Sequence, residues 1–109
     1  MPSPKRTKTR FRFAAGVIEW RGPSPFYFVP VPREASAEIR AVAKFVTYGW
    51  GVIPVEAVIG GVRFTTSLFP RDAIYLLPLK VVVRRQAAIT VGDEVAVDMT
   101  IGGAARPEP

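Results

Sequence analysis

Eleven prolines lie in a chain of 109 residues, and their number limits the possible folds more than any other feature. Because proline lacks a backbone N–H and cannot continue a helix, long helices are excluded over most of this chain. Valine, isoleucine, phenylalanine, tyrosine and threonine are frequent between the prolines, and these residues favour strands. The sequence therefore predicts a mostly β fold with many turns and one or two short helices.

Length and composition indicate one domain with a core of its own. Domains usually contain about 100 to 150 residues, and a content of 49% apolar and 22% charged residues is typical of a globular protein. We expect a basic disordered arm over residues 1–10, a β-barrel domain over residues 11–101 and a disordered tail over residues 102–109.

The spacing of apolar residues predicts where the elements lie. Alternating apolar positions, separated by turn-forming residues, predict strands over residues 11–20, 26–31, 52–59, 62–69, 74–79 and 94–101. The Gly60-Gly61 dipeptide favours a tight hairpin between two of these strands. A helix is expected over residues 33–44, with Ile39 on its apolar face. A second, short basic helix is expected to end near Ala88, although its valines lower the helix propensity.

The absence of cysteine and histidine excludes whole classes of chemistry. Without these residues the chain has no disulfide, no thiolate nucleophile, no triad of the Ser-His-Asp type and none of the usual zinc or copper ligands. No other acid, base and nucleophile can be assembled, so we expect a protein that is not an enzyme and has no cofactor or metal. No run approaches the ~20 apolar residues of a membrane span, so we expect a cytoplasmic monomer or weak dimer without a membrane partner.

The positive charge is concentrated at one end of the chain. Five of the fifteen basic residues lie in the first twelve positions: Lys5, Arg6, Lys8, Arg10 and Arg12. The remainder of the chain contains ten basic and nine acidic residues. A basic arm of this kind neutralises phosphates and binds nucleic acid in a salt-dependent way. The alternative is a solvated segment that keeps the protein soluble.

A second group of basic residues is a candidate binding site. Lys80, Arg84 and Arg85 are spaced so that they share one face of a helix. With Arg71 as a neighbour, this face is predicted to contact phosphates or an anionic ligand. The alternative is a solvated face whose charges pair with nearby carboxylates, namely Asp93, Glu94 or Asp98.

Two amphipathic aromatic residues complete the set of candidate binding residues. Trp50 lies between two glycines and could form a platform on which a base or sugar stacks. Tyr75 lies near the start of the apolar strand predicted over residues 74–79 and is the second candidate. The alternative for Trp50 is a plug at one end of a small barrel, with its indole N–H bonded to backbone.

The chain also contains two stretches with a common layout. Residues 28–55 and residues 75–95 each contain a strand, a proline, a short helix, a glycine turn and another strand. Two such units can pack about a pseudo-two-fold axis and close a barrel, which removes exposed sheet edges.

The second of these stretches resembles the half-barrel of swapped-hairpin transcription factors of the AbrB and MazE kind, on Pro78, Arg84 and the run Gly92-Asp93-Glu94-Val95. A wider set of motifs, in this order, resembles the bacterial family called domain of unknown function nineteen-oh-five: Val31-Pro32-Arg33-Glu34, Gly49-Trp50-Gly51 with Pro54-Val55, Gly60-Gly61, Thr66-Ser67-Leu68-Phe69-Pro70, Tyr75-Leu76-Leu77-Pro78-Leu79-Lys80, Arg84 and Gly92-Asp93-Glu94-Val95. The resemblance implies a single-chain double-split β-barrel with a pseudo-two-fold internal repeat. It implies no established activity.

These features favour a small binding module, and they leave two kinds of partner open. The first is nucleic acid, on account of the basic arm and the kinship of the fold. The alternative is a small ligand or a protein, bound in a concave apolar pocket on which basic groups such as Lys80 and Arg84 converge.

Overall fold

The computed structural model describes residues 10–20, 26–46 and 53–101 of the chain. Side chains 42–46, within the first helix, lie outside this description. The described part contains seven strands and two short helices: β1 (Arg10–Gly16), β2 (Ile18–Trp20), β3 (Phe26–Pro30), α1 (Arg33–Val46), β4 (Ile53–Ile59), β5 (Val62–Arg71), β6 (Ile74–Leu79), α2 (Val81–Gln86) and β7 (Glu94–Ile101). The mostly β prediction is therefore confirmed.

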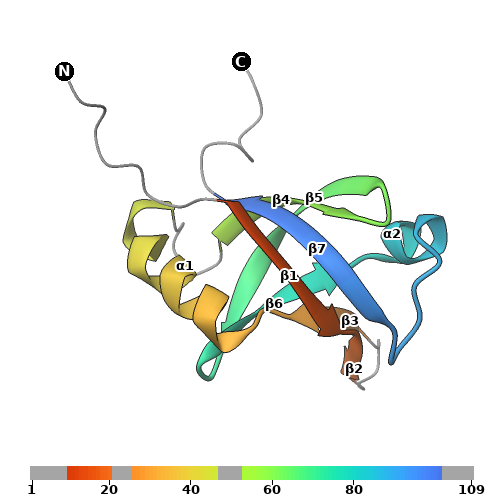
Figure 1. The fold of residues 1–109 in the computed structure, drawn as a ribbon, viewed down its shortest axis with the longest axis horizontal. Coiled ribbons are helices and arrows are strands. Elements are labelled where there is room, and N and C mark those ends of the chain that lie inside the picture. The colour runs from red at the N-terminus through yellow and green to blue at the C-terminus, as the bar shows by residue number, and fades with distance from the viewer. Residues whose placement is uncertain (1–9, 21–25, 47–52, 102–109) are drawn as a thin grey trace, which may run out of the picture.

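All seven strands form one antiparallel sheet in the order β1-β7-β4-β5-β6-β3-β2. The sheet curls into a half-barrel, so that β1 and β7 cross one side of the core and β6 the other (Figure 1). The core inside the curl includes the inward residues of β7, which are Val95, Val97, Met99 and Ile101 as predicted. The half-barrel agrees with the predicted barrel in outline, and the described residues show no internal repeat.

The predicted hairpin is confirmed at Gly60 and Gly61. Their φ angles are +56° and +81°, a left-handed pair that side chains with a Cβ rarely adopt. Two successive residues with positive φ form the turn whose twist matches that of an antiparallel hairpin. The turn therefore fixes the register of β4 against β5, in which Ile59 lies opposite Val62.

One predicted strand is wrong in its extent. The run over residues 11–20 was expected to be continuous, but it breaks at Val17 into β1 and β2. The Val17 N–H donates to the Asp93 carbonyl at 2.8 Å, and the Val17 carbonyl accepts from the Gly92 N–H at 3.0 Å. Beyond this point the chain pairs with β3 and no longer with β7. The apolar residues occupy odd positions up to Val17 and even positions at Ile18 and Trp20, a change of phase that the prediction of one continuous strand overlooked.

Both helices lie where the sequence predicts them. Helix α1 buries Ile39 completely. Helix α2 forms in spite of three consecutive valines, because Val83 is buried in the core while Val81 and Val82 remain exposed. The helix ends at Gln86, and in the turn that follows Ala88 has a φ of +56° and the Ile89 N–H donates to the Arg84 carbonyl at 2.9 Å.

An ion-pair network crosses the outer face of β1 and β7. Arg10 donates two hydrogen bonds to the Asp98 carboxylate, at 2.7 and 3.0 Å, and Arg12 lies 3.5 Å from the same group. The hydrogen bonds from Arg10 hold the pKa of Asp98 below its ordinary value of 3.8. A lowered carboxyl pKa means that the pair stabilises the folded state above pH 3.8 and loses this effect as the pH falls through the lowered pKa.

We therefore expect Asp98→Asn to lower the melting temperature at pH 7 by about 1–3 °C, because exposed pairs contribute little. The difference from the unmodified protein should vanish once the pH is below the lowered pKa. Thermal melts at neutral and acidic pH measure both. Glu94→Gln, on the same face of β7, is the matched control. An Asp98→Asn difference that persists in acid would contradict the assignment.

Candidate functional site

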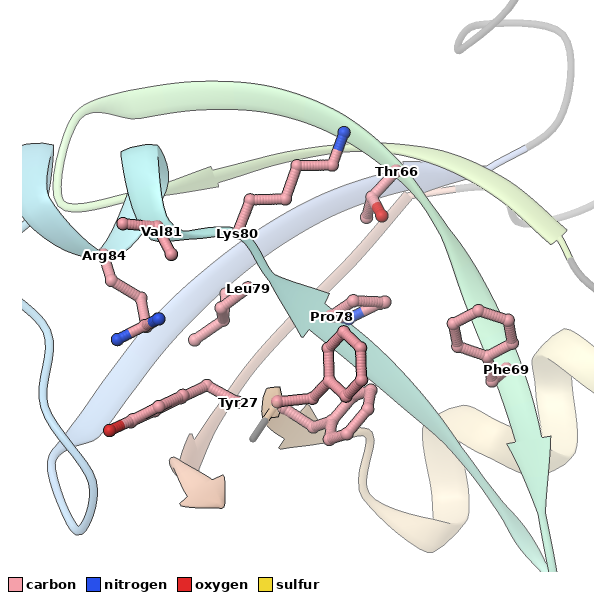
Figure 2. Close-up of a pocket in the computed structure, with 10 residues that line it drawn as sticks. Tyr27, Thr66, Phe69, Pro78, Leu79, Lys80, Val81 and Arg84 are labelled. Atoms are coloured by element: carbon pink, nitrogen blue, oxygen red, sulfur yellow. The ribbon is translucent and has the colours of Figure 1, made fainter. Parts of the chain in front are cut away.

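A pocket of about 570 Å³ opens between β3, β5, β6 and the start of α2 (Figure 2). Volumes of about 300–1,000 Å³ are usual for small-molecule sites. Its lining is mostly aromatic and aliphatic, with two cations at one side: Phe26, Tyr27, Phe28, Thr66, Phe69, Pro78, Leu79, Lys80, Val81 and Arg84. The pocket is thus an apolar hollow with a positively charged rim.

The pocket exists because β5 takes part in two ladders. Its residues 62–68 pair with β4, whereas residues 69–71 pair with β6. The pairing of β5 with β6 therefore reaches no further than Phe69 opposite Leu76, and β6 continues beside β3 alone. Thr66 and Phe69 line the pocket from the β5 side, and Pro78 and Lys80 line it from the β6 side (Figure 2). We call this opening between the two strands the split.

Aromatic rings form one wall of the pocket and extend beyond it. Phe26 is 61% exposed and its ring centroid lies 6.3 Å from that of the buried Phe28. Phe28 in turn meets Trp20 edge-on at 6.2 Å. Phe69, 46% exposed, also lines the pocket. Exposed aromatic residues gathered in this way mark a surface suited to contact with another molecule.

Two cations stand at the rim of the pocket. The Arg84 guanidinium lies over the Tyr27 ring, with its central carbon 3.7 Å from the ring centroid, and this contact holds the side chain in place. The Arg84 Nε is buried and has no hydrogen-bond partner among the described residues. Lys80 is exposed and immediately precedes α2, so it lies one helical turn from Arg84. None of the residues that line the pocket carries a carboxylate.

The predicted binding residues are only partly brought together. Lys80 and Arg84 both line the pocket, as the helical spacing indicated, whereas Arg85 is exposed and does not line it. Arg71 lies over the Trp20 ring at 3.8 Å, on the aromatic surface that continues from the pocket. Tyr75 is 4% exposed and belongs to the core.

Other candidates fall on residues that the structure leaves undescribed. Trp50 and the glycines beside it lie outside the described residues, as do residues 1–9 of the basic arm and the tail over 102–109. The arm, Trp50 and the tail therefore stay predictions. Arg10 and Arg12 are described, and both contact Asp98.

Two of the three carboxylates that were candidates to neutralise the basic face, Asp93 and Asp98, have other contacts. Asp98 pairs with Arg10 and Arg12. Asp93 accepts a hydrogen bond from the Thr90 N–H at 2.8 Å, so its carboxylate tightens its own turn. The described ion pairs thus do not join either of these carboxylates to Lys80 or Arg84. Within the described ranges no group of three acidic residues could hold a metal ion, and no helix is long and apolar enough to cross a membrane.

The aromatic wall was missed by reasoning from the sequence. A signal was present, because Phe26-Tyr27-Phe28 places large rings on both faces of one short strand and a sheet rarely buries both. Tyr27 faces the core side and supports Arg84, while Phe26 and Phe28 face the other side. Phe69 gave no comparable signal, since its position depends on where β5 changes partner.

Fold and site together define a small antiparallel half-barrel domain with a cation-rimmed apolar pocket in the split of its sheet. Residues 13–99 match the family model described as Domain of unknown function (DUF1905), so the chain belongs to that family and its predicted membership is confirmed. No curated protein matches the chain.

Proposed function

We propose that this domain is a non-enzymatic binding module, and that its ligand has an apolar, preferably aromatic body and an anionic group. The observation that carries the proposal is the pairing of an aromatic pocket with Lys80 and Arg84 at its rim, unopposed by any carboxylate in the lining. The absence of catalysis and a cytoplasmic location stay predictions.

The physical chemistry of the pocket favours this class of ligand. Burying apolar surface contributes about 25 cal/mol per Å², and the exposed rings of Phe26 and Phe69 are available for it. The Arg84 guanidinium is held in place over the Tyr27 ring, and its N–H groups at the rim can donate to an anion. The hydroxyl of Thr66 lies on the side of Lys80 and can donate to an anion bound there (Figure 2).

A second candidate function is association with single-stranded nucleic acid. The side chains of Trp20, Phe26 and Phe69 are exposed, and the cation Arg71 lies over Trp20. Proteins bind single-stranded nucleic acid by stacking its bases on aromatic side chains that have positive charge beside them. The basic arm would add salt-dependent affinity. This candidate has less support than the first, because the arm lies outside the described residues.

We also propose that the half-barrel is the single-chain double-split barrel implied by the family resemblance. Support comes from the strand pairing: β3 pairs antiparallel with β6, and β4 pairs antiparallel with β7. The first unit consists of β3, α1 and β4, and the second consists of β6, α2 and β7, so that a helix separates the two strands of each unit. A pseudo-two-fold relation between the units requires this arrangement.

Binding of the aromatic sulfonate 1-anilinonaphthalene-8-sulfonate, followed by its fluorescence, tests the proposed function. We expect Arg84→Gln to raise the dissociation constant about tenfold, since a charge-assisted contact to an anion is worth about 1.5–3 kcal/mol. Arg85→Gln is the matched control, because Arg85 is the neighbouring cation and does not line the pocket.

The same titrations include a fluorescein-labelled single-stranded oligonucleotide at about 50 and 200 mM salt. Selective loss of sulfonate binding in Arg84→Gln supports the pocket as the site. Equal affinity of the two variants for the sulfonate would refute it. Oligonucleotide binding that is lost at the higher salt and in a chain starting at residue 10, which keeps the whole of β1, would favour the second candidate.

A further inference from the structure

The direction of the backbone groups can be followed through the sheet from the hydrogen bond between Val31 and Tyr75. The Val31 N–H donates to the Tyr75 carbonyl at 2.9 Å, in register with the ladder between β3 and β6. In an antiparallel ladder, residues whose backbone groups face the partner alternate with residues whose groups face the opposite side. The groups of Leu77 and Leu79 therefore face β3, and those of Leu76 and Pro78 face β5.

This alternation leaves β6 unable to donate a hydrogen bond into the split. Leu76 pairs with Phe69 at the end of the ladder with β5. Pro78 is the next residue that faces β5, and it has no N–H. Proline at such a position ends strand pairing, which explains why β5 and β6 separate there.

Strand β5, in contrast, presents a free edge. Since Phe69 faces β6, the backbone groups of Arg63, Thr65 and Ser67 face the same side, and those of the residues between them face β4. No described strand pairs with this side of β5 over residues 62–68. Arg63 and Thr65 are exposed and Ser67 is half-buried, so the edge is accessible to another molecule.

We propose that the ligand of this domain is an extended peptide that adds as a strand to the free edge of β5, with an aromatic side chain in the pocket and acidic side chains beside Lys80 and Arg84. The inference rests on the proposed function and names its ligand class. Addition of a strand to an open edge gives affinity through backbone hydrogen bonds, while pockets for alternate side chains give specificity.

Charge selects an acidic peptide over a second copy of the chain. Arg71 lies at the end of β5, and Lys80 and Arg84 lie across the split, whereas Arg63 near the other end of β5 already pairs with Glu56 at 3.3 Å. Two copies joined through this edge would bring these like charges together, which opposes association. An acidic peptide meets complementary charge at the same place.

The test uses a fluorescein-labelled peptide of sequence Thr-Glu-Thr-Phe-Thr-Glu-Thr and fluorescence anisotropy with the full chain. Its acidic and aromatic side chains share one face of a strand, and its symmetry makes strand direction immaterial. Two further peptides carry N-methyl groups, one on alternate threonines and the other on the phenylalanine and a glutamate. The charge control replaces both glutamates with lysine.

When a peptide adds as a strand to one edge of a sheet, only every second residue of the peptide donates its N–H to that edge. We therefore expect one N-methylated peptide to bind at least about tenfold more weakly and the other within about twofold of the parent. The lysine peptide should also bind at least about tenfold more weakly. Equal affinities of the two N-methylated peptides, or no peptide binding at all, would overturn the proposal. A dimer of the chain that the peptide does not dissociate would overturn it as well.

Thr65→Pro supplies the corresponding change on the protein, with Thr65→Val as the control that keeps the N–H. The proline removes a donor that faces the split and leaves the bonds to β4 in place. We expect lost peptide binding with retained binding of the aromatic sulfonate. Retained sulfonate binding also shows that the variant is folded. If the peptide fails to bind while the sulfonate still binds, the proposed function stands and only the peptide proposal fails. If neither the sulfonate nor the peptide binds to the unmodified chain or to the variants, the proposed function itself fails.

Discussion

Ser36→Ala is expected to lower the free energy of unfolding by about 2–4 kcal/mol, although it removes a single oxygen atom. Ser36 is completely buried. Its hydroxyl donates to the Val31 carbonyl at 3.0 Å and accepts from the Tyr75 N–H at 3.1 Å. Alanine would leave both backbone groups buried without this partner, and each such group costs about 1–3 kcal/mol.

The position of the hydroxyl explains why the effect should be large. Val31 and Tyr75 continue the ladder between β3 and β6, and the Val31 N–H already donates to the Tyr75 carbonyl. The hydroxyl of Ser36 takes the place of the second bond of that pair, so it joins the first turn of α1 to two strands at once. Loss of this bridge should loosen the helix as well as the ladder.

Urea unfolding, followed by circular dichroism, measures the effect as a lower midpoint with an unchanged slope. Ser67→Ala is the matched control, because Ser67 is half-buried on β5 and no described hydrogen bond involves its hydroxyl. A loss below about 0.5 kcal/mol in Ser36→Ala, the range of an ordinary surface substitution, would contradict the bridging role. It would mean that Val31 and Tyr75 close the second bond of their pair directly.

Features that depend on neighbouring residues could be predicted from the sequence. The hairpin at Gly60 and Gly61 follows from the positive φ that its turn requires. The strand over residues 94–101 follows from its alternation, and the position of α1 follows from its apolar face and the preceding Pro32. Each of these signals acts over a few residues, so the fold class could be read without knowing the tertiary structure.

Features that depend on contacts between distant segments could not be predicted. The break at Val17 arises where the chain exchanges one partner strand for another, and the change of apolar phase at Ile18 does not say which strands those partners are. Ser36 reads as an ordinary helix residue until Tyr75, 39 positions away, is placed beside it. The half-barrel itself depends on β5 pairing with both β4 and β6.

The candidate site divides in the same way. Lys80 and Arg84 could be paired in advance, since four residues on a helix place them on one face. The aromatic wall could not, because Phe26 and Phe69 come together only through the sheet order and the split. Arg85 was included on spacing alone, and the structure places it outside the pocket lining. A basic helix face predicts a charged surface, and only the tertiary fold supplies the cavity beside it.

Leu77→Ala is expected to destabilise the protein by about 2–5 kcal/mol, the largest effect of any substitution considered for this chain. Leu77 is completely buried on β6 and lies opposite Val29, within the main core cluster. Its loss removes apolar contacts and leaves a cavity, and the pairing of Leu77 with Val29 of β3 restricts the movement that would fill it. Small domains have a total stability of about 5–15 kcal/mol, so the variant should be only marginally folded.

Leu77→Ile is the control for this substitution, because it conserves volume and should cost less than about 1.5 kcal/mol. Equilibrium unfolding in urea measures both variants, and a cost for Leu77→Ala similar to that of Leu77→Ile would mean that the core collapses around the site. The neighbouring Pro78 faces the pocket while Leu77 faces the core. At a temperature where the alanine variant is folded, it should therefore bind the aromatic sulfonate with the affinity of the unmodified protein, which separates the stability of the half-barrel from the chemistry of its split.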